Sequence, residues 1–395
     1  MNVAGKIPFR DRVGIWVPPA AKYDKRLPGM AAMPYTHPIG RRWVESGHLR
    51  RASPAEIQAR AYAVAATLQL ECLDLRHFRA NDLRVLLDEE SALWRERLHW
   101  DYRSSANLLL QYVDSHLLVG YVALDQKKIC GYTFCVQEHA KAIIGGVFAT
   151  RAAHASAPAT AVEAKLLDHL LETLLHTPGL ERIESQLLLY PHGTHRAAFE
   201  KAGFRLFPRL FMELDIDADA TPEPARNHDW DREISLLGGA LHIRRWQETD
   251  FEAATRIIAA AYADHIDSAI NDQYCSTAGA NRFLHNIVRF PGCGQFEIDA
   301  SCVVLDTQSG SLQAVLLASR ISPDIGHITQ ICVSPNLRRQ HIGQTLLEVA
   351  ANRLRRMGCR SVTLTVTEAN RAAIDLYTKL GYRTRHSFDA MLWTA

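Results

Sequence analysis

A short segment near the C-terminus constrains the fold more than any other part of the sequence. An apolar stretch, His327–Val333, runs into a Pro-containing turn, then a basic loop with Arg338 and Arg339, and then a helical pattern that begins at Gly343. The N–H groups in the first turn of a helix have no partner within that helix, and the helix dipole is positive there. Strand, basic loop and helix start together predict an anion-binding turn that suits a pyrophosphate.

The segment that follows supports this interpretation with a second strand and a second helix. Residues 361–367 alternate between apolar and hydroxyl-bearing side chains, which is typical of a strand with two different faces. Asn370 is a favourable residue to begin a helix, and Gly381 is the type expected just past a helix end. On this helix Asn370, Ala373 and Tyr377 fall on one face, because residues three and four apart are neighbours.

These two motifs resemble the signatures of the GNAT superfamily of acyl-CoA-dependent N-acetyltransferases. The acetyl-CoA signature of that family is Gln or Arg, two residues, Gly, one residue, then Gly or Ala. This chain reads Arg338-Arg339-Gln340-His341-Ile342-Gly343, so the arginine and the final glycine match, whereas His341 stands where the first glycine usually lies. The second signature, residues 370–382, matches well. The resemblance covers about residues 241–395.

The resemblance implies a mixed α/β sheet for this region, and the sequence patterns place its elements. Strands are expected at residues 241–246, 301–305, 312–320, 327–333, 361–367 and 388–393, and helices at roughly 250–266, 277–289, 343–357 and 370–380.

Acetyl-CoA is the implied co-substrate, and no metal is expected. In the family, the strand before the basic loop parts from its parallel neighbour, and its freed backbone pairs with the pantetheine amides. Asn370 is either a helix cap, a contact to the pantetheine arm, or both. The implied cofactor-binding residues are Ile331, Cys332, Val333, Arg338, Arg339, Gln340, His341, Ile342, Gly343, Gln344, Thr345 and Asn370. Direct transfer needs no nucleophile, so Cys332 is interpreted as a small buried side chain.

Acetyl transfer to an amine requires a group that accepts a proton, a group that stabilises an oxyanion and a group that donates a proton. The amine must lose a proton, the carbonyl oxygen needs a donor as it becomes an oxyanion, and the departing thiolate benefits from a proton. The resemblance implies that a main-chain N–H of the 327–333 strand is the oxyanion donor and that Tyr377 is the general acid. The alternative for Tyr377 is an aromatic residue packed on an amphipathic helix.

Residues for the general base are less clearly marked. His327 and Gln330 lie on the strand where family members place a base or a water-holding residue, although a lone histidine on a strand is more often structural. Asp264, Asp267 and Asp272 lie in the segment between the first two helices, which borders the acceptor site in relatives. Such acids bind a cationic amine or accept its proton through water, or they are solvated caps and turns.

The middle of the chain repeats features of its end, at a spacing of about 170 to 180 residues. Leu73-Asp74-Leu75-Arg76 parallels Leu241-His242-Ile243-Arg244, and Lys201-Ala202-Gly203-Phe204 parallels Lys379-Leu380-Gly381-Tyr382. The fold class expected is therefore α/β: two tandem GNAT-like mixed α/β domains plus a basic, partly disordered N-terminal extension. The boundaries expected are an extension at 1–52, an amphipathic helix at 53–71, a degenerate domain at 72–217, a linker at 218–238 and a catalytic domain at 239–395.

The first copy lacks the residues that would hold acetyl-CoA. No glycine occurs between Val147 and Pro178, where the phosphate loop is expected. Alignment of the two copies places Glu163 opposite Gly343, and a carboxylate there would repel a pyrophosphate. Phe199 falls opposite Tyr377 and lacks the hydroxyl. We therefore expect the first copy to bind no CoA and to support the second copy or shape its acceptor cleft.

Composition narrows the class of protein further. The net charge of +2 gives no case for a nucleic-acid or membrane partner, and no apolar run is long enough to span a bilayer. Eight cysteines without a CxxC pair indicate neither a zinc site nor a disulfide framework, so a cytoplasmic location is expected. Residues 1–51 contain ten Lys or Arg and three acidic residues. This segment is interpreted either as a basic arm or as a poorly ordered extension.

Three functions fit these patterns. The first is an N-acetyltransferase that acts on a small-molecule amine, and the second acts on a protein or peptide amine. The tandem layout is also similar to that of mycothiol synthase, whose acceptor is a cysteinyl sugar conjugate. The third is a CoA-binding or scaffold protein without turnover, given His341 and the degenerate first copy.

Overall fold

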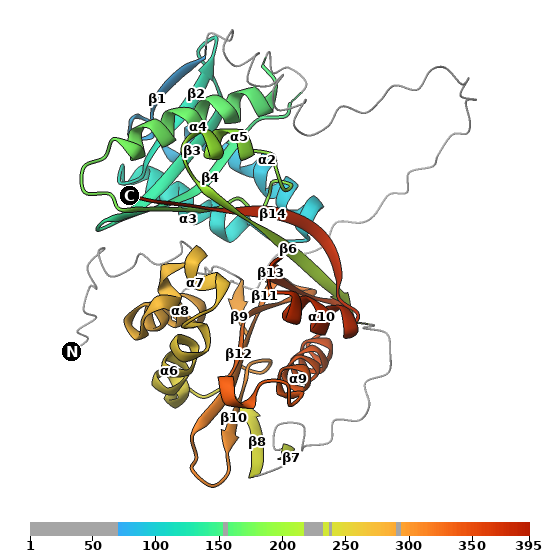
Figure 1. Cartoon of the computed structure of the whole chain (residues 1–395). Coiled ribbons are helices and arrows are strands. Elements are labelled where there is room, and N and C mark those ends of the chain that lie inside the picture. Colours follow the sequence, from blue (N-terminus) through green and yellow to red (C-terminus); the bar gives the residue numbers. More distant parts are fainter. Residues whose placement is uncertain (1–69, 153–156, 217–231, 237–238, 290–293) are drawn as a thin grey trace, which may run out of the picture.

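The computed structural model describes residues 70–152, 157–216, 232–236, 239–289 and 294–395 (Figure 1). The expected N-terminal extension and nearly all of the expected helix at 53–71 lie outside these ranges, as does most of the expected linker at 218–238. Within the described residues the chain is mixed α/β, as the sequence predicts.

The first copy begins with a short strand, a helix pair and a run of antiparallel strands. Its elements are β1 (Glu71–Asp74), α2 (Ala80–Leu98), α3 (Arg103–Asp114), β2 (Val119–Asp125), β3 (Lys128–Glu138), β4 (Lys141–Ala149), α4 (Ala159–Leu175), β5 (Arg182–Gln186), α5 (Arg196–Lys201) and β6 (Arg205–Asp215).

The second copy repeats this order. Its elements are β7 (Arg232–Leu236), β8 (Gly239–Arg245), α6 (Phe251–Tyr262), α7 (Ile266–Ile270), α8 (Thr277–Arg289), β9 (Gln295–Phe296), β10 (Cys302–Asp306), β11 (Leu312–Ser322), β12 (Ile325–Val333), α9 (Ile342–Arg356), β13 (Ser361–Thr367), α10 (Arg371–Lys379) and β14 (Arg383–Thr394). Every strand and helix expected here is present. The short helix α7 was not expected, and β14 begins well before residue 388.

The two copies exchange their last strands. The sheet runs β1-β2-β3-β4-β5-β14-β6-β13-β12-β11-β10-β8-β7, so β14 of the second copy lies between β5 and β6 of the first. In turn β6 pairs with β13, and β6 and β14 pair antiparallel with each other. Figure 1 shows both strands crossing the space between the two halves. The boundaries near residues 217 and 239 therefore mark where the sequence repeat ends and begins again. They do not mark separate folded units, because each copy contributes a strand to the sheet of the other.

Helices cover both faces of each half, which explains the long apolar runs in the central strands. In the second copy, α9 and α10 pack on one face over Ile243, Leu316 and Val362, and α6 and α8 pack on the other over Val303 and Val315. A separate small cluster joins the halves at the exchanged strands: Leu98, Trp100, Phe211, Ile321, Ile325 and Phe388. This cluster packs the two copies directly against each other.

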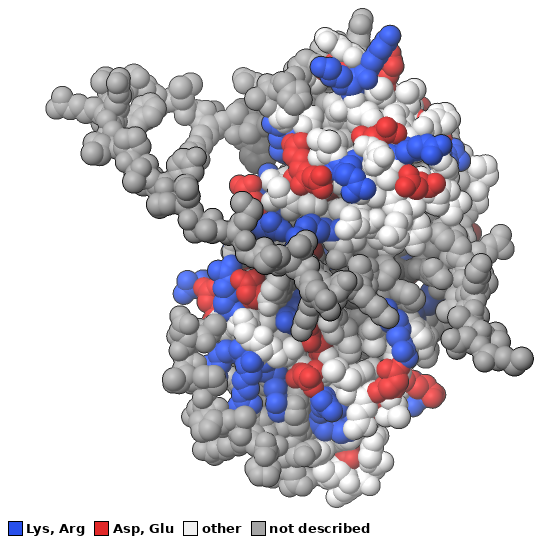
Figure 2. Space-filling view, turned by 180° about the vertical axis from the view of Figure 1, so that it is seen from behind, with Lys and Arg blue, Asp and Glu red and all other residues white. Residues whose placement is uncertain are grey.

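The described residues carry charges of both signs on one face, and they contain no helix suited to span a membrane and no cluster suited to bind a metal. On the face shown in Figure 2, basic and acidic side chains are interspersed over both halves. Among the described helices, none combines the length and the apolar character that a membrane span requires. Groups of His, Cys, Asp and Glu able to hold a metal ion are likewise absent from the described part of the chain.

Candidate active site

The two parallel strands at the centre of the second copy part halfway along their length. β12 pairs with β13 from Ile325 to Ile328, opposite Ser361 to Leu364, and this pairing ends there. Thr329 is bulged, because Leu317 on β11 faces Gln330 and the next residue, Ala318, faces Ile328. A bulge bends its strand and increases the local twist. The backbone of residues 331–333 therefore lies beside an opening, where the resemblance implies contacts to pantetheine.

The basic loop keeps the shape of a glycine turn although it carries a histidine. A 3-10 turn, Pro335–Leu337, leads to Arg339 and His341, which have φ angles of 63° and 60°. This left-handed region costs a non-glycine residue roughly 1 kcal/mol. His341 nevertheless adopts it and occupies the N-cap position of α9, without a capping hydrogen bond from its side chain. The departure from the family signature at this position is thus compatible with the loop conformation that glycine normally supplies.

Gly343 lies in the first turn of α9, where the surrounding side chains leave room for a Cβ atom. A Cβ atom built on Gly343 would lie 3.7 Å from Cδ2 of Leu376, an ordinary contact distance. The protein itself therefore does not require glycine here. Close approach of a ligand to the backbone is the remaining reason for the missing side chain.

Arg338 does not point freely into solvent from the loop. Its Nη2 donates to the carbonyl oxygen of Ala261 at 2.8 Å, near the end of α6. Cations favour helix C-termini, so this bond fastens the loop to α6.

A cavity of about 940 Å³ joins this loop to the first copy. Nearly all of the residues expected to bind the cofactor line it, from Ile331–Val333 through Arg338, Arg339 and His341–Gln344 to Asn370. Gln340 and Thr345 are the exceptions, and the hydroxyl of Thr345 donates to the carbonyl of His341. The far end is lined by first-copy residues, among them Trp94, Trp100 and Tyr102.

Tyr377 is buried on α10 and lines the cavity, with its ring centroid 5.8 Å from that of Tyr382. Burial raises the pKa of Tyr377 well above its usual value, and the nearby charge of Asp267 adds to the increase. The phenol is therefore protonated at neutral pH, as a general acid must be before it acts.

His327 is enclosed by aromatic rings. Its Nδ1 lies 2.9 Å from Oγ1 of Thr363, and its ring is 5.4 Å from that of Trp100 and stacks on Phe211 at 6.1 Å. Burial lowers the pKa of His327 to about 3. Such an imidazole is a weak proton acceptor, so the surroundings favour the structural interpretation of His327 over the base.

Gln330 is held among tyrosines at the bulge. Its Oε1 accepts a hydrogen bond from the Tyr274 hydroxyl at 3.4 Å, and Tyr274 stacks on Tyr262 with ring centroids 4.2 Å apart. The amide Nε2 of Gln330 is buried and, among the described residues, lacks a hydrogen bond of good geometry. The Tyr262 hydroxyl and the Cys332 thiol lie near this amide, and Gln330 lines the cavity.

His265 is a cavity residue that sequence reasoning missed. It precedes α7, and its Nδ1 accepts a hydrogen bond from the backbone N–H of Asp267 at 3.2 Å. Its Nε2 lies 3.1 Å from Nδ2 of Asn370, which also caps α10 through a bond from the N–H of Ala373. Burial lowers the pKa of His265, so it is neutral at neutral pH. Its position next to Asp264 and Asp267 was the only signal available.

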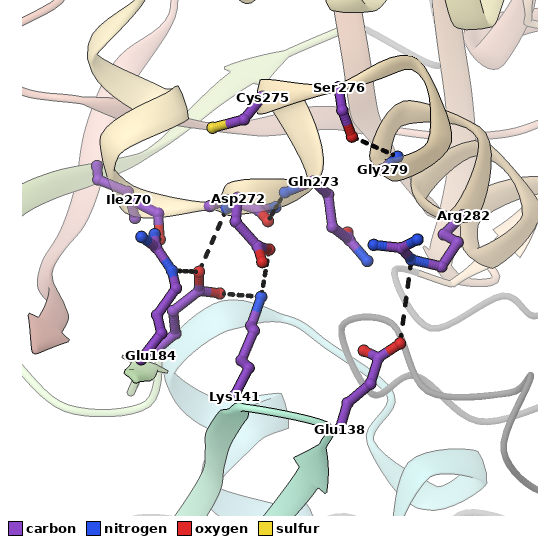
Figure 3. A network of polar contacts seen from close by, with 12 residues as sticks. Glu138, Lys141, Glu184, Ile270, Asp272, Gln273, Cys275, Ser276, Gly279 and Arg282 are labelled. Atoms are coloured by element: carbon purple, nitrogen blue, oxygen red, sulfur yellow. Dashed lines mark hydrogen bonds and ion pairs between the residues drawn. The ribbon is translucent and has the colours of Figure 1, made fainter. Parts of the chain in front are cut away.

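The three predicted acids have separate environments. Asp267 lines the cavity and accepts a hydrogen bond from the Thr367 hydroxyl, at the end of β13. Asp264 is exposed. Asp272 forms an ion pair with Lys141 of the first copy, whose Nζ also lies 2.8 Å from Glu184. Figure 3 shows this network between the β3–β4 edge and the segment from Ile270 to Arg282.

In the first copy, a buried polar cluster occupies the corresponding region. Glu163 on α4 is fully buried, lies 3.0 Å from Nη2 of Arg151, and accepts a hydrogen bond from the Tyr190 hydroxyl at 2.8 Å. Burial raises the pKa of Glu163 to about 7. Phe199, aligned with Tyr377, is completely buried. Oε2 of Glu163 makes no hydrogen bond within the described residues, but the cluster fills this region, and a phosphate would have to displace it.

Fold and site together define a two-copy α/β protein of the N-acetyltransferase fold, with a cavity beside the parted strands of the second copy. Residues 274–382 match the model of the acetyltransferase (GNAT) family. The C-terminal half therefore carries a GNAT domain, as its two motifs indicate.

Curated relatives match over short stretches. A mycothiol acetyltransferase of Geodermatophilus obscurus is 37% identical over 65 residues, which are 16% of this chain and 21% of that protein. The ribosomal protein bS18-alanine N-acetyltransferase of Escherichia coli K12 is 34% identical over 76 residues, 19% of this chain and 51% of that protein. The chain thus spans about half or less of the length of these relatives.

Solved structures match over both copies. A GCN5-related N-acetyltransferase from Sphaerobacter thermophilus has a TM-score of 0.56 at 15% identity and covers 82% of this chain and 95% of its own. A tandem GNAT protein from the clavulanic acid biosynthesis pathway has a TM-score of 0.52 at 14% identity, with 82% and 98% covered. At these identities the likeness concerns the fold alone, and it confirms the tandem fold class.

Proposed function

We propose that this chain transfers the acetyl group of acetyl-CoA directly to the primary amine of a small molecule, in the cavity of the second copy. The observation that carries this proposal is that the parted strands, the basic loop and Tyr377 line one continuous cavity. The first-turn N–H groups of α9 and the loop would hold the pyrophosphate. The freed backbone of residues 331–333 would hold the pantetheine arm.

In the proposed reaction the amine nitrogen attacks the thioester carbonyl carbon. The C–S bond breaks, Tyr377 gives its proton to the departing thiolate, and a base takes the proton that the amine nitrogen loses. A backbone N–H of β12 or the amide Nε2 of Gln330 would stabilise the oxyanion. His265 is our candidate for the base, because it is neutral and lines the cavity; it would take the proton at Nδ1, in place of the 3.2 Å hydrogen bond from the N–H of Asp267. His327 is not, because burial depresses its pKa to about 3.

The first copy would line part of the cavity and hold one turn of the second copy in place. Arg182 donates to the carbonyl oxygens of Ala269 and Ile270 at 2.8 and 3.2 Å, and Lys141 pairs with Asp272. These contacts fix the turn that carries His265 and Asp267. The aromatic residues of the first copy close the far end of the cavity, which favours a small molecule over a folded protein as acceptor.

A peptide amine is the second candidate, supported by the Escherichia coli relative, whose name states an alanine of a ribosomal protein as its substrate. Thiol release on mixing the full chain, acetyl-CoA and a library of small amines tests the proposal. Saturable release with a small amine supports it. Mass shifts on peptides without release from small amines would favour the second candidate, and saturable acetyl-CoA binding without release from either would indicate a binding protein.

The base is tested separately. His265→Gln should lower the turnover number and remove the acid limb of the pH–rate profile, with the affinity for acetyl-CoA retained. An unchanged acid limb would exclude His265.

A further inference from the structure

Arg209 is a basic side chain that lines the cavity away from the basic loop and has no carboxylate partner among the described residues. Arg209 lies on β6, the strand that the first copy gives to the sheet of the second, and it is partly buried. Its Nη1 donates to Oε1 of Gln186 at 2.9 Å, and its guanidinium lies over the ring of Phe388, 6.0 Å from the centroid. Its Nε is buried and makes no hydrogen bond. Within the described ranges no carboxylate forms an ion pair with it.

The register of the sheet places Arg209 on the cavity side. Side chains alternate along a strand, so Arg209 shares a face with Phe211, which stacks on His327. Leu210 and Met212 point the other way and pack with the core under α9 and α10. Arg209 also faces Thr367 across the pairing of β6 with β13. The hydroxyl of Thr367 donates to Asp267, so Arg209 lies close to the group that borders His265 and Tyr377.

Three aromatic side chains line the same end of the cavity as Arg209. Trp94 stacks on Tyr102 with ring centroids 4.8 Å apart, and Trp100 meets Trp94 edge-on at 5.7 Å. All three come from α2 and the segment that follows it in the first copy, and all line the cavity with Arg209. Flat rings of this kind pack against apolar or aromatic groups of a ligand.

From these contacts we infer that Arg209 is a carboxylate-binding subsite, and that the acceptor is an amine with a carboxylate and an apolar or aromatic body. This inference rests on the proposed function. A guanidinium with free N–H groups binds a carboxylate through charge-assisted, often bidentate, hydrogen bonds. The net charge of the chain is only +2 and its surface charges are mixed, so selection of an anionic group would depend on the cavity itself. A carboxylate on the acyl chain of the donor would use the same guanidinium.

The experiment compares matched substrates and variants of the full chain. Thiol release is measured with L-phenylalanine and with phenethylamine, which lacks the carboxylate, using acetyl-CoA as donor. Succinyl-CoA with phenethylamine tests the carboxylate on the acyl side. The variants are Arg209→Gln and Arg209→Lys, and the control is Arg205→Gln, which changes an exposed arginine of the same strand outside the cavity.

Wild-type protein should prefer the carboxylate-bearing partner by about ten- to a hundred-fold in kcat/KM. Arg209→Gln should abolish that preference through the KM of the carboxylate-bearing partner, Arg209→Lys should restore part of it, and the KM for acetyl-CoA should stay unchanged. Turnover of phenethylamine should change much less than the preference does, and only through the pKa of His265, which the charge of Arg209 lowers. Preference for phenylalanine places the carboxylate on the acceptor, and preference for succinyl-CoA places it on the acyl chain. No preference in wild type, or equal losses with both acceptors in Arg209→Gln, would overturn the inference.

A binding measurement separates this subsite from the reaction. N-acetyl-L-phenylalanine should change the fluorescence of Trp94 and Trp100, whereas N-acetylphenethylamine should bind about ten-fold more weakly, and Arg209→Gln should remove this difference. If this difference is found without any thiol release, the subsite stands and the proposed reaction fails. Thiol release without any difference in binding would support the proposed reaction and contradict the proposed subsite.

Discussion

Lys141 pairs with Asp272, although Lys141 belongs to β4 of the first copy and Asp272 to the turn after α7 in the second. Lys141 also contacts Glu184, and only 11% of its side chain is exposed. We expect Lys141→Met to lower the free energy of unfolding by roughly 2 kcal/mol, because two carboxylates lose a partly buried partner. It should also raise the KM of the acceptor more than that of acetyl-CoA. Urea unfolding and steady-state kinetics measure both.

The matched control for Lys141 is Arg245→Met. Arg245 pairs with Asp299 while about half of each side chain is exposed, so its loss should change stability by less than about 0.5 kcal/mol. Equal effects of the two substitutions would contradict an anchoring role for Lys141.

Tyr377 and Tyr382 provide a matched pair of phenols. We expect Tyr377→Phe to lower the turnover number by about a hundred-fold or more, because a general acid contributes on this scale. Tyr382 is equally buried but does not line the cavity, so Tyr382→Phe should leave turnover near the wild-type value. Stopped assays of thiol release at saturating acetyl-CoA check this. Similar turnover in both variants would exclude Tyr377 as the acid.

His341 pays a conformational cost that glycine would avoid. Replacement by glycine should stabilise the chain by about 0.5 to 1 kcal/mol, since φ is 60° at this position, and acetyl-CoA should bind at least as well. Replacement by valine should destabilise it by at least about 1 kcal/mol, because branched residues tolerate this region poorly. Chemical unfolding and calorimetry give both quantities. A destabilised His341→Gly variant would show that the imidazole makes a contribution beyond its backbone.

Gly343→Ala should affect stability and ligand binding in opposite directions. Alanine is a better helix former than glycine and fits the space, so the free energy of unfolding should stay level or rise by about 0.5 kcal/mol. The dissociation constant for acetyl-CoA should rise about ten-fold or more, because a methyl group would stand against the pyrophosphate. Gly358→Ala is the control: φ is 88° there, so it should cost stability without changing acetyl-CoA affinity. Unchanged affinity in Gly343→Ala would place the phosphates elsewhere.

His327 makes stability depend on pH. Its pKa falls from its usual 6.5 to about 3 on folding, so the unfolded chain binds more protons between these values. Stability contributed by neutral His327 is present above pH 6.5 and is lost as the pH falls toward 3. At pH 5 the loss is about 2 kcal/mol for this one group. His327→Gln should therefore show a smaller drop between pH 7 and pH 5 in urea unfolding. His195, with a similarly depressed pKa, sets part of the remaining slope.

The sequence predicts the local elements of the second copy well, because each has its own period and end signals. The 361–367 strand and the Asn370 cap are set by alternation and by a side chain that bonds the next turn. The exchange of β6 and β14 could not be predicted in this way. The alternation of apolar and polar residues in β6 or β14 is compatible with pairing to strands of either copy. Only the tertiary structure decides which strands pair.

The lining of the cavity was predicted where it depends on neighbours in the chain and missed where it depends on distant ones. The loop around Gly343 and the helix with Tyr377 are continuous motifs. Arg209 belongs to the first copy and reaches the cavity only through the exchanged strand, and His265 has no motif around it. His327 was expected as a candidate base, but its burial against Trp100 and Phe211 is a contact between copies that no local pattern reports.

The interlocked strands also bear on the history of such a chain. Once each copy had given its last strand to the other, neither could be deleted without leaving its sibling with an open sheet edge. If the first copy binds no cofactor, as its sequence predicts, the sheet of the second copy would still require its strand β6, and its side chains could change toward new ligands in the shared cavity.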